Sequence, residues 1–197
     1  MCSKIESMSD ADLLGLLVGN RHAVHLLRDA SGSLSQLLNE PMPAAYAQPR
    51  IASKLKAATE LVRRSLVEAI QHRNVLSSPA EVRAYLRVTL AKRDHEVFMV
   101  LFLDAQNRVI ASEEMFRGTL TQTSVYPREV VKRALEHNAA AVILAHNHPS
   151  GVAEPSRADE ALTQTLRAAL ALIDTRVLDH FIVAGSGVLS MAERGLL

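Results

Sequence analysis

The sequence predicts a mixed α/β protein in which a small N-terminal helical region precedes a mixed β-sheet flanked by helices. Residues 1–75 place apolar side chains at helical spacing. From residue 76 onward, short continuous apolar runs alternate with helix-capping sequences, a pattern typical of strands buried between layers of helices. The 197 residues are 48% hydrophobic and 22% charged, so a buried core is expected. We therefore predict two domains, residues 1–75 and residues 76–197.

The N-terminal region is predicted to be helical throughout. Ser9 and Asp10 can cap a first helix that carries a run of leucines and ends at Gly19-Asn20. A second helix ends near Gly32, a third begins at about Leu34, and the longest runs from about Ile51 to His72 with one apolar stripe.

The C-terminal region is predicted to alternate helices and strands. Ser78-Pro79-Ala80-Glu81 is a capping-box sequence that opens a helix to about Lys92. The run from Val97 to Leu103 predicts a strand buried on both faces. The remaining elements are a turn at Asp104–Asn107, a strand from Arg108 to Met115, a helix from Pro127 to Ala134, a strand from Ala140 to Ala145, a helix from about Arg157 to Leu172, a strand from Thr175 to Ala184 and a turn at Gly185–Gly187.

Composition limits the classes of function that need to be considered. Cys2 is the only cysteine, so an intrachain disulfide is excluded and thiolate metal ligation is disfavoured. The formal net charge of +1 does not indicate a nucleic-acid partner. No stretch reaches the roughly 18 apolar residues of a membrane span, and no signal-peptide core follows Met1. We expect a soluble cytoplasmic protein without a membrane partner.

The sequence His146-Asn147-His148-Pro149 follows a predicted buried strand and carries the chemistry of the chain. Alternate side chains of an extended segment point the same way, so both imidazoles can face one point. Ser156 can cap the next helix, and Asp159 lies in its first turn, where it can face the same point. Two imidazoles and one carboxylate leave a fourth position open for water, as in catalytic zinc sites. The sequence therefore predicts one metal ion, zinc, that activates water for hydrolysis.

Other enzyme motifs that contain similar residues fit the sequence less well. Non-haem iron oxygenases also use two histidines and a carboxylate, but on all-β scaffolds. A zinc deaminase requires a Pro-Cys-x-x-Cys segment, which this chain lacks. The His-Asn-His nuclease motif spreads its residues over a longer ββα unit, so that match is accidental.

The spacing His146-x-His148-Pro149, six residues, Ser156, two residues, Asp159 resembles the JAMM motif of the MPN/JAB metallopeptidases. A wider stretch is similar to the bacterial RadC family within that superfamily. It comprises Glu96–Val100, Gly118-Thr119, Pro127–Glu129, His146–Asp159 and Leu178–His180, and the resemblance covers about residues 80–195. The resemblance implies a JAB/MPN-like, cytidine-deaminase-like sheet. RadC-like proteins carry a traditional DNA-repair name, which implies a link to repair or recombination.

The resemblance also implies a role for each site residue. His146, His148 and Asp159 match the metal ligands, and Ser156 matches the serine that positions water or supports an oxyanion. Glu96 matches the general base. Independently, Glu96 opens an apolar strand, and an antiparallel pairing of strands 97–103 and 140–145 would bring it to His146. Glu113 and Glu114 are alternative acids, expected at the surface or behind the site, while His180 is expected to be a hydrogen-bonded residue of the core or behind a ligand.

The combined prediction is a JAMM-type, zinc-dependent hydrolase that cleaves a peptide, isopeptide or related amide bond. The substrate and the oligomeric state are not predicted.

The alternative is a DNA-associated binding module whose metal site is structural or regulatory. RadC-like proteins carry an N-terminal helix-hairpin-helix domain, and residues 1–75 resemble a degenerate form of it. The chain has no glycine between Gly32 and Gly118, so the glycine hairpin that approaches phosphate is missing. DNA binding would then depend on four basic side chains of the longest helix, Lys54, Lys56, Arg63 and Arg64.

Overall fold

The computed structural model of the protein describes residues 5–34, 37, 49–71, 74–77, 79–118 and 124–197. It divides into two compact units, Met1–Arg64 and Ser65–Leu197. Helix α4 (Pro49–Gln71) runs through this division as one continuous helix. The domain boundary between residues 75 and 76 therefore stays a prediction from sequence. None of the described helices is both long enough and apolar enough to span a membrane.

The N-terminal unit contains α1 (Asp10–Val18), α2 (Asn20–Asp29) and the first part of α4. As predicted, Ser9 caps α1, because its hydroxyl oxygen accepts a hydrogen bond from the Asp12 N–H at 3.2 Å. Gly19 ends α1 with φ at +91°, a conformation that favours glycine. The predicted third helix from Leu34 falls mostly outside the described residues. The core of this unit is one apolar cluster of Leu14, Val18, Ala23, Leu26, Leu37, Ile51 and Leu55.

The C-terminal unit is a five-stranded mixed sheet in the order β2-β1-β3-β4-β5. Its strands are β1 (Val97–Leu103), β2 (Val109–Arg117), β3 (Ala141–Asn147), β4 (Arg176–Ala184) and β5 (Gly187–Ser190). β3 pairs with β4 in parallel, and the other neighbouring pairs are antiparallel. The helical elements are α5 (Pro79–Leu90), α6 (Pro127–Glu136), α7 (Arg157–Ala171) and a 3₁₀ turn at Val75–Ser77. The mixed α/β fold is confirmed.

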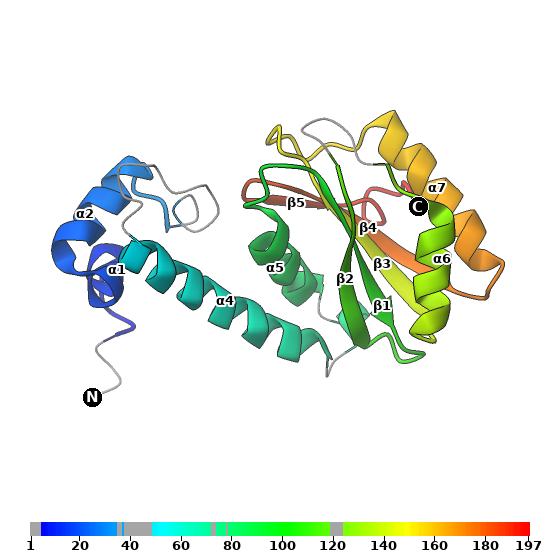
Figure 1. Cartoon of the computed structure of the whole chain (residues 1–197), viewed down its shortest axis with the longest axis horizontal. Coiled ribbons are helices and arrows are strands. Elements are labelled where there is room, and N and C mark those ends of the chain that lie inside the picture. The colour runs from blue at the N-terminus through cyan, green and yellow to red at the C-terminus, as the bar shows by residue number, and fades with distance from the viewer. Residues whose placement is uncertain (1–4, 35–36, 38–48, 72–73, 78, 119–123) are drawn as a thin grey trace. The chain divides into compact units, whose positions relative to one another are not determined.

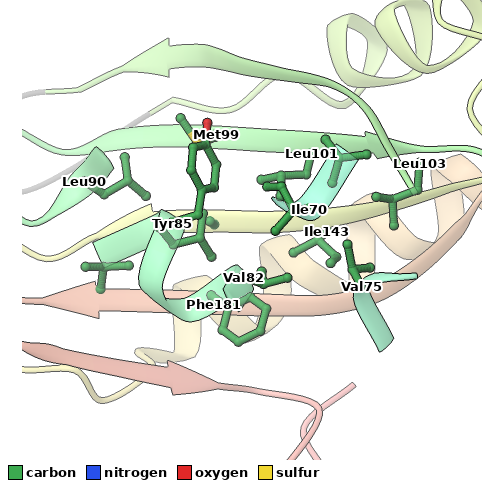
Figure 2. Close-up of a cluster of buried hydrophobic side chains, with 14 of the residues drawn as sticks. Ile70, Val75, Val82, Tyr85, Leu90, Met99, Leu101, Leu103, Ile143 and Phe181 are labelled. Atoms are coloured by element: carbon green, nitrogen blue, oxygen red, sulfur yellow. The ribbon is translucent and has the colours of Figure 1, made fainter. Parts of the chain in front are cut away.

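Helices cover both faces of the sheet, with α5 on one side and α6 and α7 on the other (Figure 1). This explains why β1 is apolar at every position, since its alternate side chains enter two different cores. Met99, Leu101 and Leu103 pack with α5 in a cluster that also holds Tyr85 and Phe181 (Figure 2). The opposite cluster, under α6 and α7, contains Phe98, Val100, Phe102, Val130, Ala134, Val142, Leu144, Leu166 and Leu170.

The ends of β2, β3 and β4 differ from those predicted, and one further strand was not predicted. β3 continues past Ala145 through His146 and Asn147, because Phe98 of β1 and Ile182 of β4 still pair with His146. The four-residue β5 was not predicted. It follows the tight turn at Gly185 and Ser186, and it is too short to show a period-two pattern.

Candidate metal centre

The two histidines of the motif lie at the end of β3, on the face covered by α7. His146 faces the same side as Phe98 and Leu144, whose side chains belong to the core under α6 and α7. The strand pairing continues beyond His146, since the His148 N–H donates to the Val183 carbonyl at 2.8 Å. Extended backbone therefore directs both imidazoles to one point, as predicted.

The start of α7 presents the carboxylate to the same point. Ser156 caps the helix, and a capping box ties it to Asp159. The Ser156 N–H and hydroxyl both donate to Asp159 Oδ2 at 2.7 Å. The Ser156 hydroxyl oxygen in turn accepts from the Asp159 N–H at 3.2 Å. Since Oδ2 already accepts two hydrogen bonds, Oδ1 is the oxygen left for a cation.

The three side chains form a compact ligand set. His146 Nε2 lies 2.9 Å from His148 Nε2 and 3.2 Å from Asp159 Oδ1, and His148 Nε2 lies 3.5 Å from Asp159 Oδ2. Ligands about 2.0–2.1 Å from a tetrahedral zinc ion lie about 3.3 Å from one another. In the part of the chain that the structure describes, this is the group of His, Cys, Asp and Glu side chains that could hold a metal ion. The residues present therefore fit zinc.

Outer hydrogen bonds leave the same nitrogen of each imidazole free for the metal. His148 Nδ1 lies 2.8 Å from the Val152 carbonyl oxygen, and His146 Nδ1 lies 2.9 Å from His180 Nε2. A carbonyl can only accept, so Nδ1 of His148 carries hydrogen and Nε2 is available as a ligand. His180 is fully buried, which agrees with the prediction that it is a hydrogen-bonded residue behind the ligands.

The electrostatics of the group favour an ionised carboxylate. Burial alone raises the pKa of Asp159, but hydrogen bonds from His146 and His148 outweigh it, and the pKa lies well below its ordinary value. The Asp159 hydrogen bond raises the pKa of His148, with a contribution from the charge of Glu96. Burial lowers the pKa of His180 far below its ordinary value.

Glu96 lies at the start of β1, beside the histidines. β1 and β3 are antiparallel, as the prediction required, and Phe98 pairs with His146. Continuing this register by two residues places Glu96 level with His148, on the same face of the sheet. The Glu96 carbonyl accepts from the Gly118 N–H at 2.8 Å, which fixes the backbone here. The structure thus brings Glu96 to the predicted metal ligands, while its role as a base stays a prediction.

The alternative acids on β2 are engaged elsewhere. Glu114 contacts Arg93. Glu113 contacts Arg133 and lies 2.7 Å from His137 Nε2, and we call these three residues the Glu113 cluster. His137 is half-buried, because it contacts Glu113 and packs against the Phe102 ring at 4.7 Å between centroids.

Two residues near the site were not anticipated from sequence. Asn147 points to the face opposite the ligands, and its Oδ1 accepts from the Val97 N–H at 2.8 Å while its Nδ2 donates to the His95 carbonyl at 3.1 Å. It therefore holds the backbone on both sides of Glu96. Thr163 lies one turn after Asp159 on α7, and its Oγ1 is 2.6 Å from His180 Nδ1. The i, i+4 spacing from Asp159 was the signal that could have identified Thr163.

The basic residues of α4 were predicted to contact DNA phosphates, but two of them are paired with a carboxylate. Arg63 and Arg64 both donate to Glu60, at 2.8 and 2.9 Å, and their hydrogen bonds lower the pKa of Glu60 to about 2. Lys54 and Lys56 are exposed. Part of the positive charge is thus neutralised within the helix.

Comparison with known proteins agrees with this geometry. Residues 76–196 match the family model of the RadC-like JAB domain. The chain is 56% identical over 202 residues to a UPF0758 protein of Leptothrix cholodnii, covering 97% of this chain and 91% of the relative. It is 55% identical over 204 residues to a UPF0758 protein of Dechloromonas aromatica, covering 97% and 90%. It is 66% identical over 149 residues to a UPF0758 protein of Acidovorax sp., covering 76% and 63%.

The similarity to the Leptothrix and Dechloromonas relatives covers 97% of the chain, and the domain match includes every residue of the candidate metal centre. The protein belongs to the RadC family, and its C-terminal unit is a RadC-like JAB domain.

Proposed function

We propose that the protein is a zinc-dependent hydrolase of the JAMM type, with one zinc ion per chain, that cleaves a peptide, isopeptide or related amide bond. The observation that carries the proposal is the ligand triangle of His146, His148 and Asp159, with nitrogen and oxygen atoms 2.9–3.5 Å apart. Membership of the RadC-like JAB family supports the same chemistry.

Each residue of the site has a task in this proposal. A bound zinc ion would supply Lewis acidity toward water and a substrate carbonyl. Asp159 and the two histidines would hold the ion, which leaves the fourth position open. Glu96 would take the proton of the attacking water and pass it to the leaving amine. Ser156 would support the developing oxyanion, for which its hydroxyl would turn away from Asp159 Oδ2.

The substrate in this proposal is a polypeptide whose identity is open. A link to DNA repair through the N-terminal unit is a second part of the proposal, and Lys54 and Lys56 are the residues that support it. Retention on immobilised DNA that declines steeply with salt, and that is weakened in Lys54→Gln and Lys56→Gln, would support this link. Retention that is insensitive to salt would contradict it.

The first test of the hydrolase is metal content. Elemental mass spectrometry measures the zinc content of the untagged wild type, His146→Ala and His148→Ala. Of these three proteins, only the wild type should contain about one zinc per chain. His137→Ala is the matched control, because His137 also contacts a carboxylate but lies in the Glu113 cluster. Folded wild-type protein that takes up no zinc when zinc is supplied would contradict the proposal.

The second test separates the base from the ligands. Glu96→Gln should retain zinc and lose hydrolysis in a panel of peptide and isopeptide substrates, because it removes the proton acceptor alone. Glu114→Gln is the control, since Glu114 contacts Arg93 instead of the site. Full activity of Glu96→Gln would remove Glu96 as the base, and a zinc-loaded wild type that cleaves no amide would favour a structural or regulatory metal.

A further inference from the structure

Two buried polar side chains lie directly behind the ligands, on the inner side of α7. His180 of β4 and Thr163 of α7 are both fully buried, with relative exposures of 0%, and His146 is 1% exposed. Water does not compete for their polar atoms, so their hydrogen bonds must be made with one another and with neighbouring protein groups. Neither residue belongs to the ligand set itself.

These residues form a continuous chain of hydrogen bonds between two of the ligands. His146 Nδ1 is 2.9 Å from His180 Nε2, and His180 Nδ1 is 2.6 Å from Thr163 Oγ1. The Thr163 hydroxyl donates to the Asp159 carbonyl at 2.6 Å. This series of hydrogen bonds thus begins at the imidazole of His146 and ends at the backbone of Asp159.

The direction of every hydrogen bond follows from the last one. The Asp159 carbonyl can only accept, so the Thr163 hydrogen is used there. The Thr163 oxygen must then accept from His180 Nδ1–H. The His180 ring is fully buried, and its two nitrogens face His146 and Thr163, neither of which is a carboxylate that could stabilise an imidazolium. An uncharged imidazole has one donor and one acceptor, so His180 Nε2 accepts the hydrogen of His146 Nδ1. The weak alternative acceptor, Met191 Sδ, is 3.8 Å from Thr163 Oγ1.

A hydrogen bond in the reverse direction, from His180 Nε2 to His146 Nδ1, would be incompatible with a metal ion. If His180 donated from Nε2, His146 Nδ1 would have to accept, and the hydrogen of a neutral His146 would lie on Nε2. That nitrogen is the one directed at His148 and Asp159. A hydrogen there would occupy the position at which the metal must bind.

From this geometry we propose that His180 and Thr163 are positioning residues of the metal centre, which fix His146 in the Nδ1–H tautomer so that Nε2 is free for the metal. The inference rests on the proposed function for its metal ion and adds residues that the JAMM motif does not contain. The same chain fixes the ring orientation of His146 and links it to the first turn of α7, which carries Asp159.

The primary experiment is zinc affinity, measured by competition with a chromophoric chelator on the full chain. Thr163→Val keeps the shape of the side chain and removes the hydroxyl, and we expect zinc to bind about 10–100-fold more weakly, the usual effect of losing an outer partner of a ligand. Thr163→Ser keeps the hydroxyl and should bind like wild type. Thr165→Val is the matched control, because Thr165 makes the same kind of bond on α7, to the Ala161 carbonyl at 2.8 Å, at an exposed position.

His180 provides a second comparison. His180→Gln retains an acceptor for His146 Nδ1, whereas His180→Leu retains only volume, so the Gln variant should bind zinc more tightly than the Leu variant. Equal affinities in these two variants, both confirmed as folded, would contradict the proposed role. So would a Thr163→Val variant that binds zinc as tightly as Thr163→Ser.

A spectroscopic measurement reads the tautomers directly. In the zinc-loaded wild type, long-range ¹H–¹⁵N correlation of the imidazole rings should show hydrogen on Nδ1 of both His146 and His180, and none on Nε2 of His180. A hydrogen on His180 Nε2 would overturn the inference while leaving zinc binding intact. Wild-type protein that binds no zinc would overturn the inference and the proposed function together, so the two failures are distinguishable.

Discussion

Two clusters on the same face of the sheet combine a carboxylate with imidazole, and they differ in the source of positive charge. In the Glu113 cluster, the carboxylate accepts two hydrogen bonds from the Arg133 guanidinium, and His137 lies 2.7 Å from it. At Asp159, the two imidazoles lie at 3.2 and 3.5 Å from the carboxylate, and Ser156 donates hydrogen bonds to it.

The comparison indicates which carboxylate–imidazole group is suited to a metal ion. The guanidinium of Arg133 already provides a permanent positive charge, so Glu113 has its cation within the protein. Asp159, His146 and His148 instead direct their ligand atoms at one point, where the proposed zinc ion would supply the positive charge. Ser156, His180 and Thr163 support this group through hydrogen bonds of their side chains.

The largest expected effect is on zinc affinity. Asp159→Asn keeps the side-chain volume and removes the charge, and we expect it to weaken zinc binding by more than the roughly 100-fold typical of losing an outer partner, since a ligand itself is lost. Glu113→Gln is the matched change in the other cluster and should leave zinc affinity unaltered. Isothermal titration of both variants checks this. Equal losses of zinc affinity in Asp159→Asn and Glu113→Gln would contradict the expectation that zinc binds at Asp159 and not at the Glu113 cluster.

Zinc should also stabilise the fold through one cluster only. At a free zinc concentration of about 100 times the Kd, binding to the native state raises the free energy of unfolding by roughly 2.7 kcal/mol. We expect this gain in the wild type and in Glu113→Gln, and none in Asp159→Asn. Urea denaturation with and without zinc measures it, and a gain retained by Asp159→Asn would indicate that zinc binds elsewhere.

Removing the internal cation should destabilise the Glu113 cluster without creating a metal site. Arg133→Met leaves Glu113 with His137 alone, and we expect a lower free energy of unfolding than in the wild type, with a modest loss because the partners are partly exposed. Added zinc should stabilise this variant no more than the wild type, since two ligands are too few. If zinc stabilised Arg133→Met more than the wild type, the charge of Arg133 alone would explain why the Glu113 cluster is not a metal site.

The smallest effect is the response of the Glu113 cluster to acid. The hydrogen bond from Arg133, assisted by His137, holds the pKa of Glu113 below its ordinary value of 4.5 despite partial burial. The resulting stabilisation is fully present above that value and is lost as the pH falls through the lowered pKa of the folded state. The stability difference between wild type and Glu113→Gln should therefore narrow as the pH is lowered from 6 to 3 in urea titrations. A difference that stays constant over this range would contradict the assignment.

Local patterns predicted most of the elements, because caps and apolar runs act over a few residues. The strand Val97–Leu103 was predicted with its observed ends, since helices on both faces make every position apolar. The group of His146, His148 and Asp159 was predicted because period-two extension and a serine cap with an aspartate in the first helical turn each indicate a side-chain direction. β5 was not predicted, and neither were Asn147 and Thr163 as partners of the site. Their contacts with His95 and His180 join segments 52 and 17 residues apart. The i, i+4 spacing places Thr163 beside Asp159, but no local pattern indicates a partner at such a separation.

The clamp made by Asn147 has a consequence for motion. Its amide joins the end of β3 to the backbone on both sides of Glu96, so a displacement of the Glu96 backbone moves the histidine-bearing strand with it. In the proposed mechanism, Glu96 would therefore keep its position relative to His146 and His148 from one turnover to the next. Its slow fluctuations should instead be those of the sheet, which places the site at the high end of local opening free energies.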